Sequence, residues 1–258
     1  MKSESLKTML TEERWKTILS LLEQRETITI TELEDEIGAS ASTLRRDLTK
    51  LAQAGKLRKI HGGAAALESG MLVRELTMDE KSSINSLEKE RIGRYAALLI
   101  EPDDFVYIDA GTTTAMLVEY IEEKDATYVT NSVMHARKLA RKGCRVFMPG
   151  GELKASTEAL VGPLAIDSLR KYHFTKCFLG TNGVSLRAGF TTPDPNEALI
   201  KQCAFEQSLQ CWCLCDSSKF DRVTPITFAP FSAIQIITDK IENPAYARSG
   251  SVEIAEPD

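Results

Sequence analysis

Serine, threonine and arginine side chains gather near the start of the sequence, where their spacing suits recognition of nucleic acid. On a helix predicted over residues 41–54, a rotation of about 100° per residue places Ser42, Arg46 and Thr49 opposite Leu44 and Leu48. Such polar side chains hydrogen-bond bases and phosphates when a helix enters the major groove of DNA. The alternative interpretation is an amphipathic helix whose basic side is simply solvated.

The charge of this region is uneven in a way that favours the first interpretation. Residues 44–61 carry six cations against one carboxylate, Asp47, in a chain whose formal net charge is −5. A local basic patch in an acidic protein gives a directional attraction for nucleic acid. The candidate DNA-binding residues are Ser40, Ser42, Thr43, Arg45, Arg46, Thr49, Lys50, Arg58, Lys59 and His61.

Local signals predict the elements that position these side chains. A first helix is predicted over residues 11–24, and a second begins at the capping-box pair Thr29 and Glu32 and ends at Gly38. After a three-residue turn Ser40 can cap the third helix, and two short extended runs around Gly62-Gly63 are typical of a β-hairpin. Helices, turn, basic face and hairpin wing together favour DNA binding over a solvated basic face.

A second group of polar residues lies in loops of the remaining chain, where helical and extended patterns alternate. Alternation predicts an α/β domain with a largely parallel sheet covered on both faces, and ligands bind such sheets beyond the carboxyl ends of the strands. The predicted strands are Phe105–Ile108, Thr127–Thr130, Arg145–Met148, Cys177–Leu179, Cys211–Cys215 and Ile234–Thr238, and the predicted helices are 87–100, one ending at Ile121, 132–141, 163–171 and 196–208.

The run from Asp109 to Thr114 is the strongest of these loops. Gly111 permits a tight turn, and three hydroxyls stand at a predicted helix N-terminus, where amides and the helix dipole attract anions. A plain structural helix start is the alternative. The run matches neither the Walker pattern nor GxGxxG, so no nucleotide and no other cofactor is predicted.

Polar residues at the other strand ends complete a predicted ligand site. Thr112 to Thr114 and Lys219 would serve a phosphate, while amides and carboxylates would serve hydroxyls, which suits a phosphorylated sugar. For Glu197 and Lys201, four apart on one helix, an exposed ion pair is the alternative. The candidate effector-binding residues are Asp109, Gly111, Thr112, Thr113, Thr114, Asn131, Ser132, Gly150, Gly151, Gly180, Asn182, Gly183, Glu197, Lys201 and Lys219.

Composition excludes several other classes of protein. No apolar run approaches a membrane span and the N-terminus lacks the apolar core of a signal peptide, so a cytoplasmic protein is expected. Six cysteines without a CxxC pair are expected to be free thiols. The alternation of Cys211, Cys213 and Cys215 places them on one face of a strand, where we expect packed small side chains, with a metal site as the alternative.

The sequence resembles the DeoR family of bacterial transcription regulators. Residues 10–67 are similar to the family's winged helix-turn-helix, in Leu10-Thr-Glu-Glu-Arg14, Ser42-Thr-Leu-Arg-Arg-Asp-Leu48 and Lys59-Ile-His-Gly-Gly-Ala64. Residues 87–240 are similar to its effector-sensing domain, in Ile108-Asp-Ala-Gly-Thr-Thr-Thr114, Val129-Thr-Asn-Ser132, Gly150-Gly-Glu-Leu153, Phe178-Leu-Gly-Thr-Asn-Gly183 and Asp216-Ser-Ser-Lys-Phe220. The resemblance implies a fold related to sugar-phosphate isomerases and CoA transferases, and sugar phosphates that change the affinity for operator DNA.

These observations predict a DNA-binding domain over 1–67, a linker over 68–86 with at most a short helix, and an α/β effector-sensing domain over 87–258. We expect a homo-oligomeric transcriptional regulator of a carbohydrate operon, a repressor according to the resemblance, with double-stranded operator DNA and a phosphorylated sugar as partners. A sugar-phosphate isomerase-like enzyme with an appended DNA-binding domain is the alternative, with Asp109 or Glu197 as its base. A DNA-binding architectural protein is a third reading.

Overall fold

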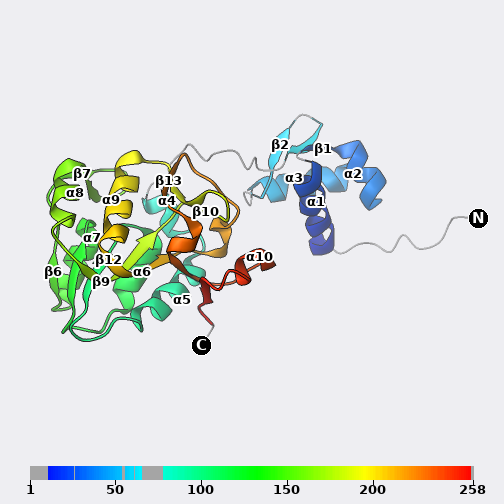
Figure 1. Ribbon diagram of the computed structural model, residues 1–258. Coiled ribbons are helices and arrows are strands. Elements are labelled where there is room, and N and C mark those ends of the chain that lie inside the picture. Colours follow the sequence, from blue (N-terminus) through cyan, green and yellow to red (C-terminus); the bar gives the residue numbers. More distant parts are fainter. Residues whose placement is uncertain (1–10, 26, 54–55, 61, 66–77, 257–258) are drawn as a thin grey trace, which may run out of the picture. The chain divides into compact units, whose positions relative to one another are not determined.

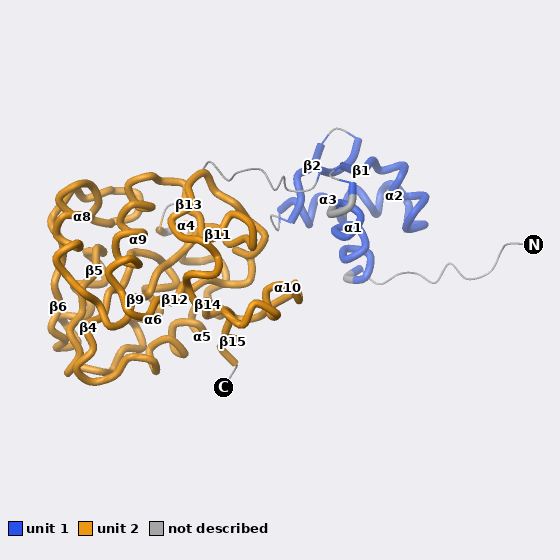
Figure 2. Tube along the Cα trace, in the orientation of Figure 1, with its two compact units in different colours: residues 1–70 blue, residues 71–258 orange. Residues whose placement is uncertain are grey.

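The computed structural model describes residues 11–25, 27–53, 56–60, 62–65 and 78–256. The chain divides into two compact units, residues 1–70 and 71–258 (Figure 2). Most of the predicted linker lies outside the described residues. Within its last part, α4 (Met78–Ser82) is a short helix.

The first unit consists of three helices and a small antiparallel sheet (Figure 1). Its elements are α1 (Thr11–Arg25), β1 (Thr27–Thr29), α2 (Ile30–Ile37), α3 (Ala41–Gln53), β2 (Arg58–Ile60) and β3 (Gly63–Ala65), with sheet order β1-β3-β2. The predicted capping box of Thr29 and Glu32 is confirmed, and Gly38 ends α2 in the left-handed conformation at φ 71°. Ser40 caps α3 by accepting from the Thr43 amide at 3.4 Å.

One aliphatic cluster holds this unit together. The buried residues Leu44, Leu48 and Leu51 lie on one side of α3, as the helical spacing predicts, and pack with Ile18 of α1 and Leu33 of α2. The hairpin of β2 and β3 is also confirmed. The strand β1 was not expected, and it pairs with β3 to extend the wing to three strands.

The second unit is built on a seven-stranded sheet, so the predicted α/β class with a parallel sheet is confirmed. The sheet order is β15-β14-β12-β9-β4-β5-β6, and every neighbouring pair is parallel. The strands are β4 (Phe105–Ile108), β5 (Thr127–Thr130), β6 (Arg145–Phe147), β9 (Phe174–Gly180), β12 (Ser208–Leu214), β14 (Gln235–Thr238) and β15 (Val252–Ile254). All six strands predicted here are present; β15 was not predicted.

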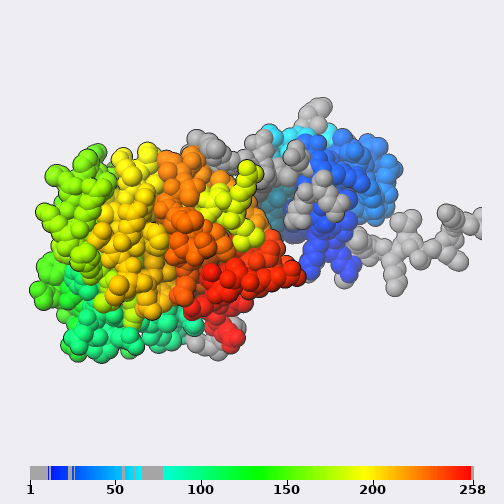
Figure 3. Space-filling model, in the orientation of Figure 1, coloured from blue at the N-terminus to red at the C-terminus, as the bar shows by residue number. Residues whose placement is uncertain are grey.

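Helices cover both faces of this sheet. Residues of α5 (Ser86–Ala97), α6 (Thr112–Tyr120) and α7 (Val133–Arg141) share one buried cluster, and those of α8 (Pro163–Leu169) and α9 (Pro195–Glu206) share the other. Figure 3 shows α8 and α9 side by side on the viewed face, in green and yellow. Alternate side chains of β4 point to opposite faces of the sheet: Val106 and Ile108 belong to the first cluster and Tyr107 belongs to the second.

Short elements that the sequence did not predict complete the unit. They are the hairpin of β7 (Glu152–Lys154) and β8 (Ala159–Val161), the antiparallel sheet of β10 (Gly183–Ser185), β11 (Gly189–Thr192) and β13 (Ile226–Ala229), the 3-10 helices η1 (Ser217–Lys219) and η2 (Phe231–Ala233), and α10 (Pro244–Ala247). All of them are only three or four residues long, too short to be predicted from a periodic pattern.

The cysteine strand follows the predicted period of two. Cys211, Cys213 and Cys215 are buried in the cluster beneath α8 and α9, whereas Trp212 lies in the opposite one. All six cysteines are buried free thiols, and burial raises the pKa of Cys211 far above its ordinary value. Among the described residues, no group of three or more His, Cys, Asp or Glu side chains is arranged to hold a metal ion. None of the described helices is both long and apolar enough to cross a membrane.

Candidate DNA-reading surface and effector pocket

The outer side of α3 presents the polar residues that the helical wheel predicts. Ser42, Arg45, Arg46 and Lys50 are exposed, and Thr43 is half-buried. Because the leucines are buried on the other side, these donors can reach a groove without any rearrangement of the core. We call α3 and its exposed residues the reading helix.

The only carboxylate of the reading helix is turned inward. Asp47 is 4% exposed and binds Arg14 Nε at 2.5 Å and Trp15 Nε1 at 2.9 Å, both on α1. Burial alone would raise the pKa of Asp47, but the hydrogen bonds from Arg14 and Trp15 outweigh it and lower this pKa. A negative charge is thereby kept away from the reading surface and used to fix α3 on α1.

The wing is joined directly to the reading helix. Lys59 Nζ of β2 donates to Thr49 Oγ1 at 2.9 Å, and that hydroxyl donates to the Arg45 carbonyl at 2.7 Å. Arg58 and Lys59 are exposed. The predicted DNA contact His61 lies outside the described residues. The hydroxyl of Thr49 is therefore engaged within the unit, whereas the arginines of the helix face outward.

In the second unit the polar residues converge at the carboxyl ends of β4 and β9. Along the chain, β4, β5 and β6 extend the sheet in one direction, and β9, β12, β14 and β15 extend it in the other. The gap between β4 and β9 is thus the point where the strand order reverses, which is where open α/β sheets bind ligands. A pocket opens here, lined by Met78, Lys81, Ile84, Lys89, Ala110, Gly111, Thr112, Thr113, Thr157, Gly180, Thr181, Asn182, Glu197, Lys201 and Lys219.

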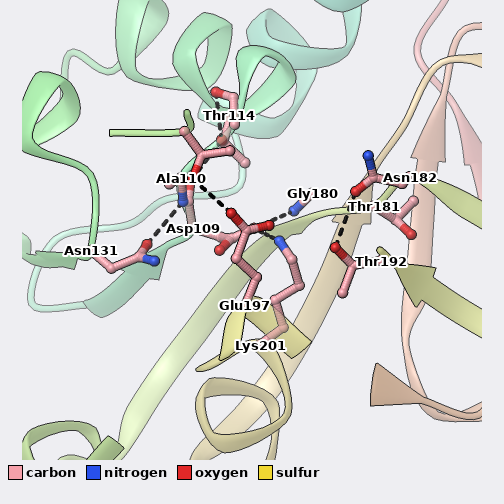
Figure 4. A network of polar contacts seen from close by, with 12 residues as sticks. Asp109, Ala110, Thr114, Asn131, Gly180, Thr181, Asn182, Thr192, Glu197 and Lys201 are labelled. Carbon is pink, nitrogen blue, oxygen red and sulfur yellow. Dashed lines mark hydrogen bonds and ion pairs between the residues drawn. The ribbon is translucent and has the colours of Figure 1, made fainter. Parts of the chain in front are cut away.

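A buried ion pair lies at this pocket (Figure 4); Lys201 is one of the lining residues, whereas Asp109, a predicted effector-binding residue, is not. The Asp109 carboxylate, directly after β4, accepts from Lys201 Nζ of α9 and from the Gly180 amide at 3.0 Å. Both side chains are nearly inaccessible, with 3% and 5% of their surface exposed. Burial would lower the pKa of Lys201, but Asp109 and Glu197 outweigh this and raise it. Lys201 is therefore a fixed cation, and an exposed ion pair with Glu197 is excluded.

Glu197 lies on the same helix and faces the hairpin of β7 and β8. Its Oε1 accepts from Thr157 Oγ1 at 2.7 Å and from Lys154 Nζ at 3.0 Å. Burial would raise the pKa of Glu197, but Lys201, Thr157 and Lys154 outweigh it and lower this pKa. The carboxylate is therefore ionised and can still accept hydrogen bonds from hydroxyl groups in the pocket.

Cations line the opposite wall. Lys89 of α5 is 4% exposed, and burial lowers its pKa to about 8, with Lys219 and Lys81 acting in the same direction. Burial also lowers the pKa of Lys219. The Asp216 carboxylate acts in the opposite direction on both lysines. This wall therefore carries cations whose charge Asp216 offsets only in part.

The start of α6 meets these cations in the same pocket. The first amides of a helix have no acceptor within the helix, and Gly111, Thr112 and Thr113 place that end at the pocket wall. The hydroxyl of Thr114 is turned away, because it donates to the carbonyls of Asp109 and Gly111 at 2.7 and 3.0 Å. The arrangement is suited to an anion with several oxygen acceptors.

Some of the predicted effector residues support the pocket from outside. Asn131 Oδ1 accepts from the Ala110 amide at 2.9 Å and so holds the loop after β4, whereas Ser132 caps α7. Gly150, Gly151 and Gly183 do not line the pocket. Gly150 and Gly151 follow β6, at the far edge of the sheet.

Sequence reasoning missed seven of the lining residues, namely Met78, Lys81, Ile84, Lys89, Ala110, Thr157 and Thr181. Three of them belong to the segment expected to be a linker, and Lys89 belongs to a helix with no expected ligand role. In the sequence, only the two cations Lys81 and Lys89, which precede the first strand of the sheet, could have indicated this part of the pocket.

Comparisons with known proteins agree with both units. Residues 14–70 match the DeoR-like helix-turn-helix domain, and residues 84–240 match the DeoR C-terminal sensor domain. The chain is 43% identical over 235 residues to FruR of Bacillus subtilis, an uncharacterized HTH-type transcriptional regulator, covering 91% of this chain and 93% of that protein.

A repressor and an enzyme are also among the similar proteins. The lactose phosphotransferase system repressor of Streptococcus mutans is 33% identical over 235 residues, covering 90% of this chain and 93% of its own. Ribose 5-phosphate isomerase A of Methanocaldococcus jannaschii, a solved structure, is 13% identical, with a TM-score of 0.40 over 53% of this chain and 55% of that one. With matches to both domain models and a 43% identical relative along most of its length, the chain belongs to the DeoR family of transcriptional regulators.

Proposed function

We propose that this regulator is a repressor of a carbohydrate-metabolism operon, and that a phosphorylated sugar bound in the pocket of the second unit changes its affinity for operator DNA. The observation that carries the proposal is that one pocket brings together two lysines, the N-terminus of α6 and the polar side chains of Asn182 and Glu197. The similarity to the lactose phosphotransferase system repressor of Streptococcus mutans supports the same assignment.

These groups suggest how such a ligand would lie. Lys89, Lys219 and the N-terminus of α6 would bind the phosphate, since charge-assisted hydrogen bonds are the strongest available there. Asn182 and Glu197 would bind sugar hydroxyls at the other wall. The buried pair of Asp109 and Lys201 would hold both walls in register rather than bind the ligand directly.

DNA recognition would follow from the reading helix and the wing. One short helix gives little affinity alone, so we propose a homo-oligomer that presents paired reading helices to two half-sites. Ser42, Thr43, Arg45 and Arg46 would contact bases, and Lys50, Arg58 and Lys59 would contact phosphates. In this proposal ligand binding relieves repression. This requires that the ligand binds the DNA-bound regulator more weakly than it binds the free regulator.

The isomerase alternative is disfavoured by the state of its two candidate bases. Burial raises the pKa of Asp109, but this residue does not line the pocket and is bound by Lys201 and the Gly180 amide. Glu197 lines the pocket, but its pKa is lowered and it is bound by Lys154 and Thr157. A general base must be within reach of a substrate proton and able to accept it. We therefore propose that the pocket senses its ligand without converting it.

A thermal-shift screen in phosphate-free buffer tests the proposal. It compares hexose, pentose and hexitol phosphates with their unphosphorylated parents, and ligand at ~100 times its Kd stabilises by about 2.7 kcal/mol, which is roughly 5–10 °C for a domain of this size. Lys219→Gln should lose the shift and the exposed Lys171→Gln should keep it. No shift with any phosphorylated sugar would contradict the pocket assignment, and turnover in the same samples would restore the enzyme alternative.

A further inference from the structure

The effector pocket adjoins a second cavity, which lies where α4 and α7 meet α6. Met78, Lys89 and Thr112 line both cavities. Lys89 and the N-terminus of α6, to which Thr112 belongs, are the groups that would bind the phosphate. Asn182 and Glu197, which would bind sugar hydroxyls, line only the effector pocket. A phosphate held by Lys89 and Thr112 would therefore lie at the junction of the two cavities.

The second cavity is more apolar than the effector pocket. Ala115, Met116 and Met134 line it, and Met134 is 51% exposed. Its volume is about 250 Å³, whereas a cavity of about 150 Å³ lined by apolar side chains is enough to bind benzene. Three further lining residues are polar and exposed, namely Ser82, Ser86 and Glu158. We call this cavity the apolar chamber, and it has room for a group the size of an aromatic ring.

One polar side chain is buried at the wall of the apolar chamber. His135, in the first turn of α7, is 3% exposed, and neither of its ring nitrogens has a hydrogen-bond partner among the described residues. Burial lowers the pKa of His135 to about 4, with the Gly111 backbone acting in the opposite direction, so the imidazole is neutral at neutral pH. A buried polar group without a hydrogen bond is costly. The chamber is therefore suited to an apolar group with an uncharged polar atom rather than to a second anion.

We propose that the apolar chamber is a second subsite of the effector site, and that it takes a ring esterified to the same phosphate whose sugar lies in the effector pocket. The class of ligand is thus a sugar phosphodiester with its phosphate at Lys89 and Thr112. A ring is favoured because methionine side chains such as Met116 and Met134 make favourable contacts with aromatic groups. This inference rests on the proposed function, since it requires a phosphate at the junction; it adds the chemistry of the second ester group.

Calorimetric titration of the full chain tests the subsite with phenyl phosphate and methyl phosphate, two esters of equal charge that differ in the ring. Phenyl phosphate should bind about fivefold to tenfold more tightly, the effect of burying about half of a phenyl ring. In Met134→Gln this preference should fall to about twofold to threefold, while the affinity for methyl phosphate stays unchanged. The matched control is Met148→Gln, at a methionine that is 38% exposed and does not line the chamber, and it should equal the wild type.

The ring signals of the histidines in nuclear magnetic resonance spectra locate the bound ester. Those of His135, identified by their loss in His135→Phe, should shift strongly with phenyl phosphate and little with methyl phosphate, whereas those of the exposed His173 should stay in place. Three results would each overturn the second subsite and leave the proposed function standing: equal affinities of the two esters, an unmoved His135 signal, or no binding of phenyl phosphate by a protein that binds sugar phosphates. If neither the esters nor the sugar phosphates bind, the proposed function itself fails, and this inference fails with it.

Discussion

Replacing Asp47 by alanine should unfold the DNA-binding unit selectively. The carboxylate joins the reading helix to α1 through Arg14 and Trp15 in a nearly dry environment, with 10% of Arg14 and 6% of Asp47 exposed. Removal of Asp47 leaves the largely buried guanidinium without this carboxylate and the indole N–H without its acceptor. Both effects act on the helix that would enter the DNA groove.

The magnitude follows from the burial of the pair. Breaking a buried ion pair by removing one partner costs about 3–5 kcal/mol, and the residual exposure argues for the lower value. A unit of about 60 residues has a total stability of roughly 3–9 kcal/mol, so most of it would be lost. A loss of about 3 kcal/mol corresponds to a decrease in Tm of roughly 12–24 °C for a domain of this size.

Differential scanning calorimetry of the full chain can measure this change, because two compact units should give separate transitions. Trp15 fluorescence follows the first unit, and the buried Trp212 serves as a reference in the second. The matched control is Glu36→Ala, which removes an exposed ion pair with Arg25 at 2.7 Å and should cost at most about 1 kcal/mol. Equal effects of the two substitutions would refute the argument from burial.

The pH dependence provides a second check. The pKa of Asp47 is lower in the folded protein than in the unfolded chain, so the carboxylate stabilises folding above the unfolded pKa of about 4. This contribution is lost as the pH falls through the lower folded pKa. The difference between wild type and Asp47→Ala should therefore be constant from about pH 5 to 8, and a difference that varied across this range would contradict the assignment.

Three other predictions concern binding. Arg46→Ala should weaken binding to operator DNA by about 1–3 kcal/mol if Arg46 makes a bidentate base contact, and equal anisotropy titrations of variant and wild type would remove it from the reading surface. Lys219→Gln should abolish the calorimetric response to the phosphorylated sugar yet leave DNA affinity intact; loss of DNA binding would instead connect this loop with assembly. Because the pKa of Lys89 is about 8, phosphate affinity should fall as the pH rises through that value and protons should be taken up on binding near it. Lys89→Arg should reduce both effects in titrations from about pH 6.5 to 9.5 and leave only the part due to Lys219, whose pKa is also lowered.

The first unit could be predicted well because its signals are local. A capping box, a left-handed glycine and a helical repeat each lie within a few residues, and the structure has all three in place around α2 and α3. The addition of β1 to the wing was missed because its partner, β3, is more than thirty residues away. The sequence also gave no indication of what Asp47 binds. Its partners Arg14 and Trp15 lie on α1, and the packing of α1 against α3 brings them to it.

The pocket was predicted only in part because strand order cannot be read from periodicity. Beyond the run after β4, the other strand ends could not be ranked from the sequence, so Gly150 was grouped with Gly180, although β6 is at the edge of the sheet and β9 is beside β4. Lys89 was missed for a related reason. On its own helix it resembles a solvated cation, whereas in the structure it is buried and donates to the Lys81 carbonyl of α4.

The contacts of Asp109 with Gly180 and Lys201 also constrain the order in which the parts of the protein can fold. Asp109 joins Gly180 and Lys201, which follow it by 71 and 92 residues, so the site cannot form until the centre of the sheet has closed over long chain loops. The DNA-binding unit needs only the first part of the chain and, like most N-terminal domains, can fold first during synthesis. A nascent or truncated chain that stops before Lys201 would therefore carry a folded DNA-binding unit without a complete pocket, so DNA binding and any response to a ligand would become available at different stages of synthesis.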